Sequence, residues 1–206
     1  MLQNTRLRVT VLIVRVRKAL TLMIIQGLPI THWAYQYVEY LARRDFGKGK
    51  STTLFAPNDP ITRAEFITIL ARMSDEELPS YTGPFTDVKP DAYYAGAVAW
   101  GIEAGITKGT SDTTFSPNRS ISRQEIATLL GRYLSYKQVI LIEYNQPQSF
   151  SDEQQIAGYA KDFVSTMQKA DIINGYPDGS FKPLANATRA ESAKILALVH
   201  YSMNDR

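Results

Sequence analysis

Internal repetition constrains the fold of this chain more than any other feature of its sequence. The hexapeptide "ITRAEF" begins at Ile61, and near-copies of it, "ISRQEI" and "ATRAES", begin at Ile121 and Ala187. The same separations of 60 and 66 residues relate further matching positions, which are Trp33, Tyr93 and Tyr159; Val38, Val98 and Val164; Gly49, Gly109 and Gly175; and Phe55, Phe115 and Phe181. The chain therefore contains three versions of one unit, and the connection around residues 136–149 absorbs the extra length.

Each unit has the pattern of a helix, a loop rich in turn formers and a second helix. In the first unit Trp33, Tyr37, Val38 and Leu41 recur at helical spacing, and a second apolar stripe begins at Phe66. The segment 45–60 between them cannot continue a helix. A two-helix unit of this length cannot bury its own apolar face, so we expect the three units to pack on each other. The prediction is one mainly α-helical body with approximate threefold character.

The hexapeptide has the signature of a helix start. Thr62 and Glu65 form a capping box, in which the hydroxyl accepts from the N–H of Glu65 and the carboxylate accepts from the N–H of Thr62. The other copies provide the same pairs, Ser122 with Glu125 and Thr188 with Glu191. We therefore assign these six residues to structural helix caps.

The arginine that follows each hydroxyl is harder to explain by stability. Arg63, Arg123 and Arg189 occupy the first helical position, where the helix dipole disfavours a cation by about 0.3–1 kcal/mol. A guanidinium beside unpaired helix N–H groups would suit an anion, particularly a carboxylate. The alternative is an ion pair with an acidic residue of a neighbouring repeat. On the anion interpretation, Arg123→Ala should weaken binding without unfolding the protein.

Composition excludes several classes of protein. The formal charge is +3, but the first 18 residues contain five basic and no acidic residues, which leaves 18 basic and 20 acidic residues in the rest. A nucleic-acid-binding domain would carry its basic stripe within the folded part. The chain has no cysteine and two histidines, and no catalytic set of side chains can be assembled. We therefore expect no enzyme activity, no cofactor and no metal site.

Residues 1–24 form a basic and apolar tail. They resemble a degenerate export signal without a cleavage site, and a misplaced start is the alternative. The apolar stretch at residues 19–28 is too short to span a bilayer, so no transmembrane segment is expected.

The motifs together resemble the S-layer homology (SLH) domain family over residues 25–206. The resemblance rests on "FTDVKPDAYYAGAVAWGIEAGITKGTSDTTFSPNRSISRQEI" in the second unit, "NGYPDGSFKPLANATRAES" in the third, and "HWAYQYVEYLA" with "LFAPNDPITRAEF" in the first. It divides the chain into repeats at residues 25–78, 79–140 and 141–206.

The resemblance implies a fold, a function and a location. The family fold is a pseudo-threefold spindle of three helix-loop-helix repeats around a central helix bundle. Members bind secondary cell-wall polysaccharides, commonly with pyruvate ketals, and so anchor proteins non-covalently to bacterial envelopes. The partner would be an acidic polysaccharide attached to peptidoglycan, and the location would be the cell wall or S-layer. A larger protein or a catalytic region, lost or encoded elsewhere, is a further partner that the family suggests.

The resemblance also implies roles for particular residues. The arginines would hold the ketal carboxylate, and the aromatic residues near each first helix would face sugar, although core packing is the alternative for them. The acidic position before that helix would accept sugar hydroxyls or cap a turn, and the loop glycines would supply positive φ or close backbone approach. These predicted glycan-binding residues are Arg63, Arg123, Arg189, Trp33, Tyr93, Tyr159, Asp87, Asp152, Gly109 and Gly175.

Departures from the family pattern keep a second function open. Gly27 stands where the second repeat has Asp87, so the site with Arg123 ranks first and any site near Gly27 ranks last. The alternative is a structural or protein-interaction module that keeps the fold without a working glycan site. It predicts that all three guanidiniums are buried in ion pairs with neighbouring acids.

Overall fold

The computed structural model describes residues 27–51 and 54–204, so the predicted tail at residues 1–24 lies outside the described part. The described residues form six α-helices, two short 3₁₀ helices and no sheet. The helices are α2 (Tyr35–Arg43), α3 (Arg63–Ser74), α4 (Ala95–Glu103), α5 (Arg123–Tyr136), η1 (Glu153–Gln155), η2 (Gly158–Ala160), α6 (Lys161–Lys169) and α7 (Arg189–Asn204). The prediction of a mainly helical protein is confirmed.

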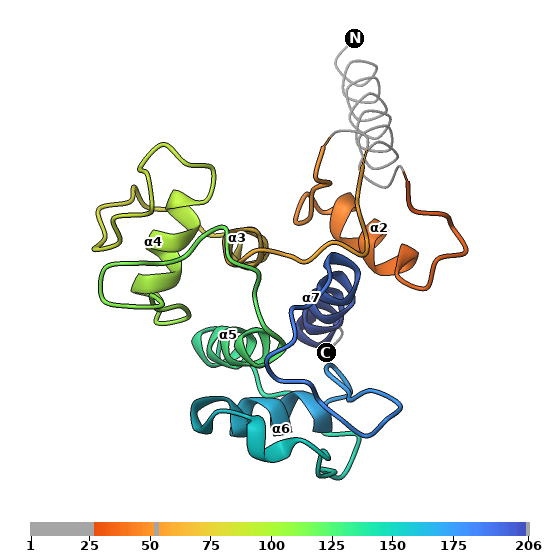
Figure 1. The fold of residues 1–206 in the computed structure, drawn as a ribbon. Helices are drawn as coiled ribbons and strands as arrows, with labels where there is room; N and C mark the ends of the chain where they lie inside the picture. The colour runs from red at the N-terminus through yellow and green to blue at the C-terminus, as the bar shows by residue number, and fades with distance from the viewer. Residues whose placement is uncertain (1–26, 52–53, 205–206) are drawn as a thin grey trace.

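Three helices lie at the centre and three lie outside them. Figure 1 shows α3, α5 and α7, the second helices of the three repeats, close together in the middle, with α2, α4 and α6 around them. Each outer helix packs on the inner helix of the preceding repeat: α4 on α3, α6 on α5, and α2 on α7. No repeat therefore buries its own apolar surface, and the third repeat closes the circle by covering the first.

Backbone hydrogen bonds join the three helix-start segments in a closed ring. The amide of Ile121 donates to the carbonyl of Ile61 at 3.0 Å, Ala187 donates to Ile121 at 3.1 Å, and Ile61 donates to Ala187 at 3.1 Å. These three residues occupy the same position in their repeats, so one bond type recurs three times around the centre. Short β-bridges flank this ring.

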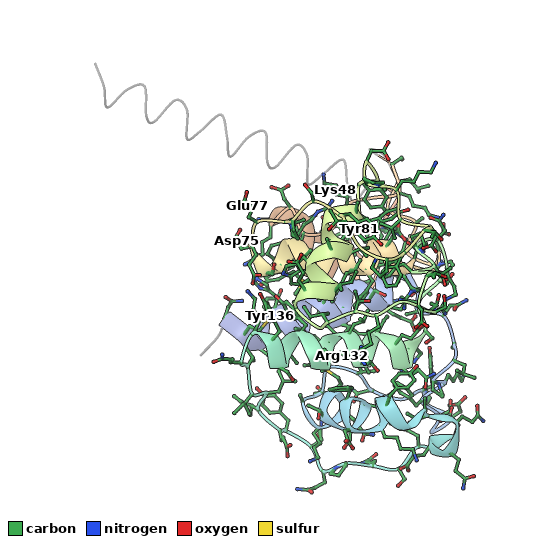
Figure 2. All side chains as sticks on the ribbon, turned by 90° about the vertical axis from the view of Figure 1, so that its left-hand side faces the viewer. Lys48, Asp75, Glu77, Tyr81, Arg132 and Tyr136 are labelled. Atoms are coloured by element: carbon green, nitrogen blue, oxygen red, sulfur yellow. The ribbon has the colours of Figure 1, made fainter. Side chains whose placement is uncertain are left out.

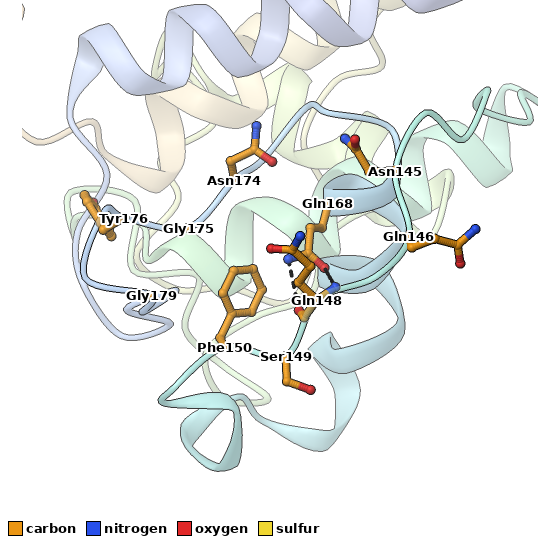
Figure 3. Close-up of a pocket in the computed structure, with 10 residues that line it drawn as sticks. All are labelled: Asn145, Gln146, Gln148, Ser149, Phe150, Gln168, Asn174, Gly175, Tyr176 and Gly179. Carbon is orange, nitrogen blue, oxygen red and sulfur yellow. Dashed lines mark hydrogen bonds between the residues drawn. The ribbon is translucent and has the colours of Figure 1, made fainter.

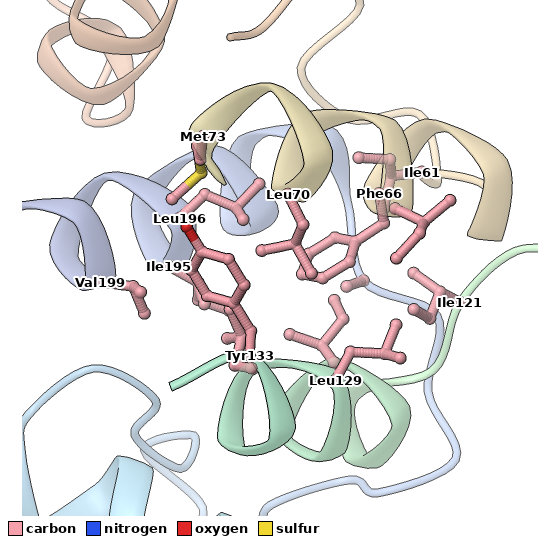
Figure 4. Packing of buried hydrophobic residues seen from close by; sticks show 14 of the residues in the cluster. Ile61, Phe66, Leu70, Met73, Ile121, Leu129, Tyr133, Ile195, Leu196 and Val199 are labelled. Atoms are coloured by element: carbon pink, nitrogen blue, oxygen red, sulfur yellow. The ribbon is translucent and has the colours of Figure 1, made fainter. Parts of the chain in front are cut away.

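Apolar side chains from all three inner helices form the core beneath the ring. Figure 4 shows Phe66 and Leu70 of α3, Leu129 and Tyr133 of α5, and Leu196 of α7 converging there. Phe66, Leu70, Tyr133 and Leu196 are fully buried. Burial of such side chains is the main favourable contribution to folding, so the repeats are stabilised as one unit.

Each inner helix begins with its amides already paired. Arg63 and Ala64 donate their backbone N–H groups to the carbonyls of Arg119 and Pro117, at 2.9 and 3.0 Å. These carbonyls belong to the loop of the next repeat, and the first two amides of α5 and α7 are bonded in the same way. The amides of Thr62 and Glu65 complete the capping box with each other's side chains, and the hydrogen bonds of the pair Thr188 and Glu191 repeat it.

Two expectations from the sequence concern the placement of the repeated aromatic residues and the presence of a transmembrane segment. Trp33 precedes α2 rather than lying on it, and Tyr93 and Tyr159 likewise precede α4 and α6. Among the described helices, none combines the length and apolar character needed to cross a bilayer.

Candidate functional site

The three arginines of the hexapeptides are cross-links between consecutive repeats. Arg63 of the first repeat donates from Nε to the carbonyl of Phe115 at 3.0 Å and from Nη2 to the carbonyl of Lys108 at 2.9 Å. Arg123 makes the matching bonds to Phe181 and Asn174, and Arg189 makes them to Phe55 and Lys48. Each guanidinium thus holds the loop of the next repeat against its own helix start.

The remaining guanidinium nitrogen of each arginine faces a glutamate of the same next repeat. Arg63 pairs with Glu125 at 3.2 Å and Arg189 with Glu65 at 2.7 Å, whereas Arg123 stands 3.9 Å from Glu191. The glutamates are those of the capping boxes. Each of these carboxylates therefore caps its own helix and also faces the arginine of the preceding repeat.

These contacts correct part of the argument from sequence. The expectation of unpaired helix amides beside each guanidinium is wrong, because carbonyls of the next loop occupy them. The three arginines are only 5–6% exposed, and each faces an acid of the next repeat, as the structural alternative predicts. Because Arg123 also binds two carbonyls, we no longer expect Arg123→Ala to leave folding intact.

A pocket of about 330 Å³ lies where the three repeats meet near Arg63. Its lining includes Arg63 from the first repeat, Lys108 and Arg132 from the second, and Tyr159 from the third. Glu125, which is paired with Arg63 and also with Arg119, lies at the same place. Three cations therefore line the pocket against one paired carboxylate. Figure 2 shows Arg132 part-way along α5, with Tyr136 at its end.

The aromatic residue of each repeat is exposed rather than packed in the core. The exposed fractions are 53% for Trp33, 67% for Tyr93 and 54% for Tyr159, so core packing is excluded for them. Tyr159 lines the Arg63 pocket, and an exposed aromatic ring offers a flat apolar surface to a ligand.

The ionisable groups of the Arg63 pocket share one electrostatic environment. Partial burial raises the pKa of Tyr159, and the negative charge of Glu125 adds to this rise while Arg119, Arg132 and Arg63 oppose it. Burial alone would raise the pKa of Glu125, but hydrogen bonds from Arg119 and Ser122 outweigh it, and the pKa lies below its usual value. Burial lowers the pKa of Arg63 against the opposing charge of Glu125. The carboxylate is thus held ionised between two arginines.

The positions equivalent to this pocket differ in charge between the repeats. The equivalent site around Arg189, called the Arg189 position, has Lys48 and Arg72 where the Arg63 pocket has Lys108 and Arg132. Its aromatic residue is Tyr93. Partial burial raises the pKa of Tyr93, while the positive charges of Arg72 and Arg189 oppose this rise. The Arg123 position has Asn174 and Leu198 instead of those two cations.

The two aspartates predicted to accept sugar hydroxyls are turn caps. Asp87 accepts from the amides of Phe115 and Ser116, both at 2.8 Å, and Asp152 accepts from those of Phe181 and Lys182 at the same distance. Both carboxylates therefore fix the loop whose carbonyl receives the arginine Nε. Gly27 takes this place in the first repeat and brings no carboxylate.

The loop glycines are required by close approach and not by positive φ. A Cβ on Gly109 would lie 2.7 Å from the carbonyl oxygen of Thr114, and one on Gly175 would lie 2.7 Å from the ring of Phe150. Neither glycine has a positive φ. The sequence left open whether these glycines supply a positive φ or a close backbone approach, and the structure shows the close approach.

Sequence reasoning missed Lys108 and Arg132 as pocket residues. Both repeat in the first unit, as Lys48 and Arg72, at the separation that relates all other matching positions. That recurrence was the available signal, and it fails in the third repeat.

In the described ranges, no group of three or more ionisable metal ligands lies together.

Comparison with known proteins identifies the family. Three segments, residues 29–67, 84–127 and 149–193, match the S-layer homology domain, and together they cover more than half of the chain. The chain belongs to the S-layer homology domain family. Domains of this family bind cell walls as anchoring modules, and they indicate a location at the cell surface.

The similar proteins are larger than this chain. The chain is 36% identical over 169 residues to the amylopullulanase of Thermoanaerobacterium thermosulfurigenes, which is 80% of this chain and 9% of that protein. It is 32% identical over 155 residues to the cellulosome-anchoring protein of Acetivibrio thermocellus, covering 73% of this chain and 34% of that protein. For the S-layer protein sap of Bacillus anthracis the identity is 26% over 170 residues, covering 82% of this chain and 20% of that protein. The alignments thus leave most of each relative outside the repeats.

Proposed function

We propose that the chain anchors a protein to the bacterial cell envelope by binding an anionic wall polysaccharide, with pyruvate ketals as the expected anionic groups. The observation that carries the proposal is the pocket between the repeats, where Arg63, Lys108 and Arg132 surround a single paired carboxylate. An anionic sugar substituent would meet an excess of positive charge there, and the exposed ring of Tyr159 would lie beside the sugar.

The role of the hexapeptide arginines changes in this proposal. Arg63 is bonded to two carbonyls and one carboxylate, so it shapes the pocket and contributes charge to its wall. The side chains left to meet the ligand directly are the exposed Lys108 and the partly exposed Arg132. We therefore rank the Arg63 pocket and the Arg189 position above the Arg123 position, which lacks both additional cations. This reverses the ranking from sequence.

The wider assignment follows from the same proposal. The repeats extend over residues 25–78, 79–140 and 141–206 and form a pseudo-threefold spindle, which the closed ring of hydrogen bonds supports. The polysaccharide is attached to peptidoglycan, and the chain acts outside the cell as a non-catalytic part of a larger assembly. Asp87 and Asp152 hold the binding loops by capping their turns, and Gly109 and Gly175 permit the close packing of these loops.

Cosedimentation with cell walls tests the proposal. The full chain should pellet with walls that retain their polysaccharide and stay in solution with walls from which it has been extracted. Lys108→Ala should weaken pelleting, while Lys161→Ala, an exposed lysine on α6 outside the pocket lining, should not. Equal pelleting with both wall preparations would refute the proposal.

One observation favours the second function, a structural module without a glycan site. All three hexapeptide guanidiniums are buried and face acids of the next repeat. If neither wall preparation pellets the chain, this structural function is the one that remains.

A further inference from the structure

A second pocket lies on the third repeat, away from the cationic lining of the Arg63 pocket. Its volume is about 360 Å³, and its ten lining residues, drawn in Figure 3, are Asn145, Gln146, Gln148, Ser149, Phe150, Gln168, Asn174, Gly175, Tyr176 and Gly179. Four of them, from Asn145 to Ser149, come from the connection between the second and third repeats. This is the segment that contains the extra length of the third unit.

The connecting segment is fixed in place at three points. The amides of Tyr144 and Asn145 donate to the carbonyl of Lys169 at the end of α6, at 2.8 and 3.1 Å. The side-chain amide of Gln168, which is 8% exposed, makes two hydrogen bonds to the backbone of Gln148, at 3.0 and 3.1 Å. Further along, the amide of Ser151 donates to the carbonyl of Gly179 at 3.0 Å. The pocket wall is therefore preformed, which lowers the entropic cost of binding.

The chemistry of the lining is neutral and rich in amides. Five of the ten residues are Asn or Gln, and none is Asp, Glu, Lys, Arg or His. The side-chain amide of Gln168 is bonded to the backbone of Gln148, and that of Asn174 donates to Asp171. The amides of Asn145, Gln146 and Gln148 remain to offer donors and acceptors to the paired hydroxyls of a sugar. The half-buried ring of Phe150 supplies an apolar surface in the same pocket, as Figure 3 shows. A charged ligand group would find no counter-ion among these residues.

The pocket adjoins the Arg123 position. The strip from Asn174 to Tyr176 lines the pocket, and the carbonyl of Asn174 accepts from Nη2 of Arg123 at 2.8 Å. The guanidinium carbon of Arg123 lies 4.7 Å from the centre of the Tyr176 ring. A polymer with one unit in the neutral pocket would therefore pass directly beside the inter-repeat surface.

We infer that this pocket binds an uncharged sugar unit of the wall polysaccharide, separately from the units whose anionic groups the Arg63 pocket would hold. The inference rests on the proposed function for the identity of the polymer, and on the amide-rich lining for the neutrality of the unit. It assigns a binding role to the inter-repeat connection, and this role is restricted to the third repeat because the other connections lack the extra residues.

Equilibrium binding of the full chain to two wall preparations tests the inference. One preparation is native, and in the other the carboxylates are converted to neutral amides. Gln148→Ala removes a side chain of the pocket but keeps the backbone groups that Gln168 holds, so the fold should be preserved. It should lower the affinity for both preparations by the same factor, about three- to tenfold. Lys108→Ala should lower the affinity for native walls only, and Gln36→Ala, an exposed glutamine on α2, should change neither.

The outcomes separate this inference from the proposed function. If the wild-type chain binds native walls through their polysaccharide and Gln148→Ala binds equally well, the inference is overturned and the proposed function stands. If Gln148→Ala weakens binding to walls without polysaccharide, the pocket binds peptidoglycan and the inference is again wrong. If the wild-type chain binds no wall, both fail together.

Discussion

At the scale of single residues, the hexapeptide arginine contributes to both stability and function. Arg63 satisfies two carbonyls of the next repeat and one carboxylate, and it also lines the candidate pocket. A cation at the first helical position is disfavoured by the helix dipole, and the nearby ionised carboxylate of Glu125 compensates for this. Sequence identified the arginine as unusual, but its partners lie in a different repeat, and spacing within one repeat cannot reveal them.

Replacement of this arginine tests its structural contribution. Arg63→Ala leaves Glu125 without one of its two arginines and two carbonyls without a donor, so it should lower the free energy of unfolding by about 2–3 kcal/mol, less than a fully buried pair would lose. Denaturant unfolding followed by circular dichroism measures this loss. Lys108→Ala, an exposed change in the same pocket, should stay within about 0.5 kcal/mol of wild type. An unchanged unfolding midpoint for Arg63→Ala would contradict the cross-link.

The loop glycine is a second test at this scale. Gly109→Ala places a methyl group against the carbonyls of Ser111 and Thr114 and the ring of Phe85, and overpacking of this kind costs about 1–3 kcal/mol. Gly158→Ala is the matched control, because nothing lies within 4 Å of its added carbon. Thermal unfolding of the two variants should show a clear loss for the first and almost none for the second. Equal midpoints would show that the loop adapts to the added methyl group.

At the scale of elements, sequence predicted the helices well and their neighbours poorly. The capping boxes and apolar stripes indicated where α3, α5 and α7 begin, since both signals are local to the chain. The pairing of α2 with α7 joins the first repeat to the last, and a pattern that is the same in all three repeats cannot distinguish that partner from any other. From the sequence, Asp87 could either accept sugar hydroxyls or cap a turn. The choice depends on the amides of Phe115 and Ser116, which lie far from Asp87 in the sequence and donate to its carboxylate in the fold.

The glutamate that caps α5 gives the module a pH dependence. Although burial acts in the opposite direction, hydrogen bonds from Arg119 and Ser122 lower the pKa of Glu125 in the folded protein. A carboxyl group with a lowered folded-state pKa stabilises the protein above its unfolded-state pKa, and this contribution is lost as the pH falls through the folded-state value. The free energy of unfolding should therefore decline with acidification below about pH 4.5, near the unfolded-state pKa.

A substitution isolates this effect. Glu125→Gln should be less stable than wild type at about pH 7, and its stability should decline less steeply in acid. The control is Glu103→Gln, at an exposed position on α4, which should follow the wild-type curve. Chemical denaturation at several pH values provides the comparison, and parallel curves for wild type and Glu125→Gln would show that Glu125 does not cause the decline.

At the scale of the whole molecule, the repeats form one unit whose surface sites draw on all of them. The Arg63 pocket takes residues from the first, second and third repeats, and the ring of hydrogen bonds holds the three helix starts in fixed relation. The sequence predicted three repeats and an anionic ligand. It did not predict that Lys108 and Arg132 line the pocket, because these residues come together with Tyr159 only in the folded protein. The positive Arg63 pocket between the repeats is the basis of the proposed anchoring.

Titration of the full chain with released wall polysaccharide, before and after its carboxylates are converted to neutral amides, tests this claim most directly. The native polysaccharide should bind saturably, and conversion should lower the affinity about tenfold or more, which corresponds to ~1.4 kcal/mol or more of lost charge interaction. Equal affinity for the native and the neutral polysaccharide would contradict the proposal that the Arg63 pocket between the repeats holds an anion.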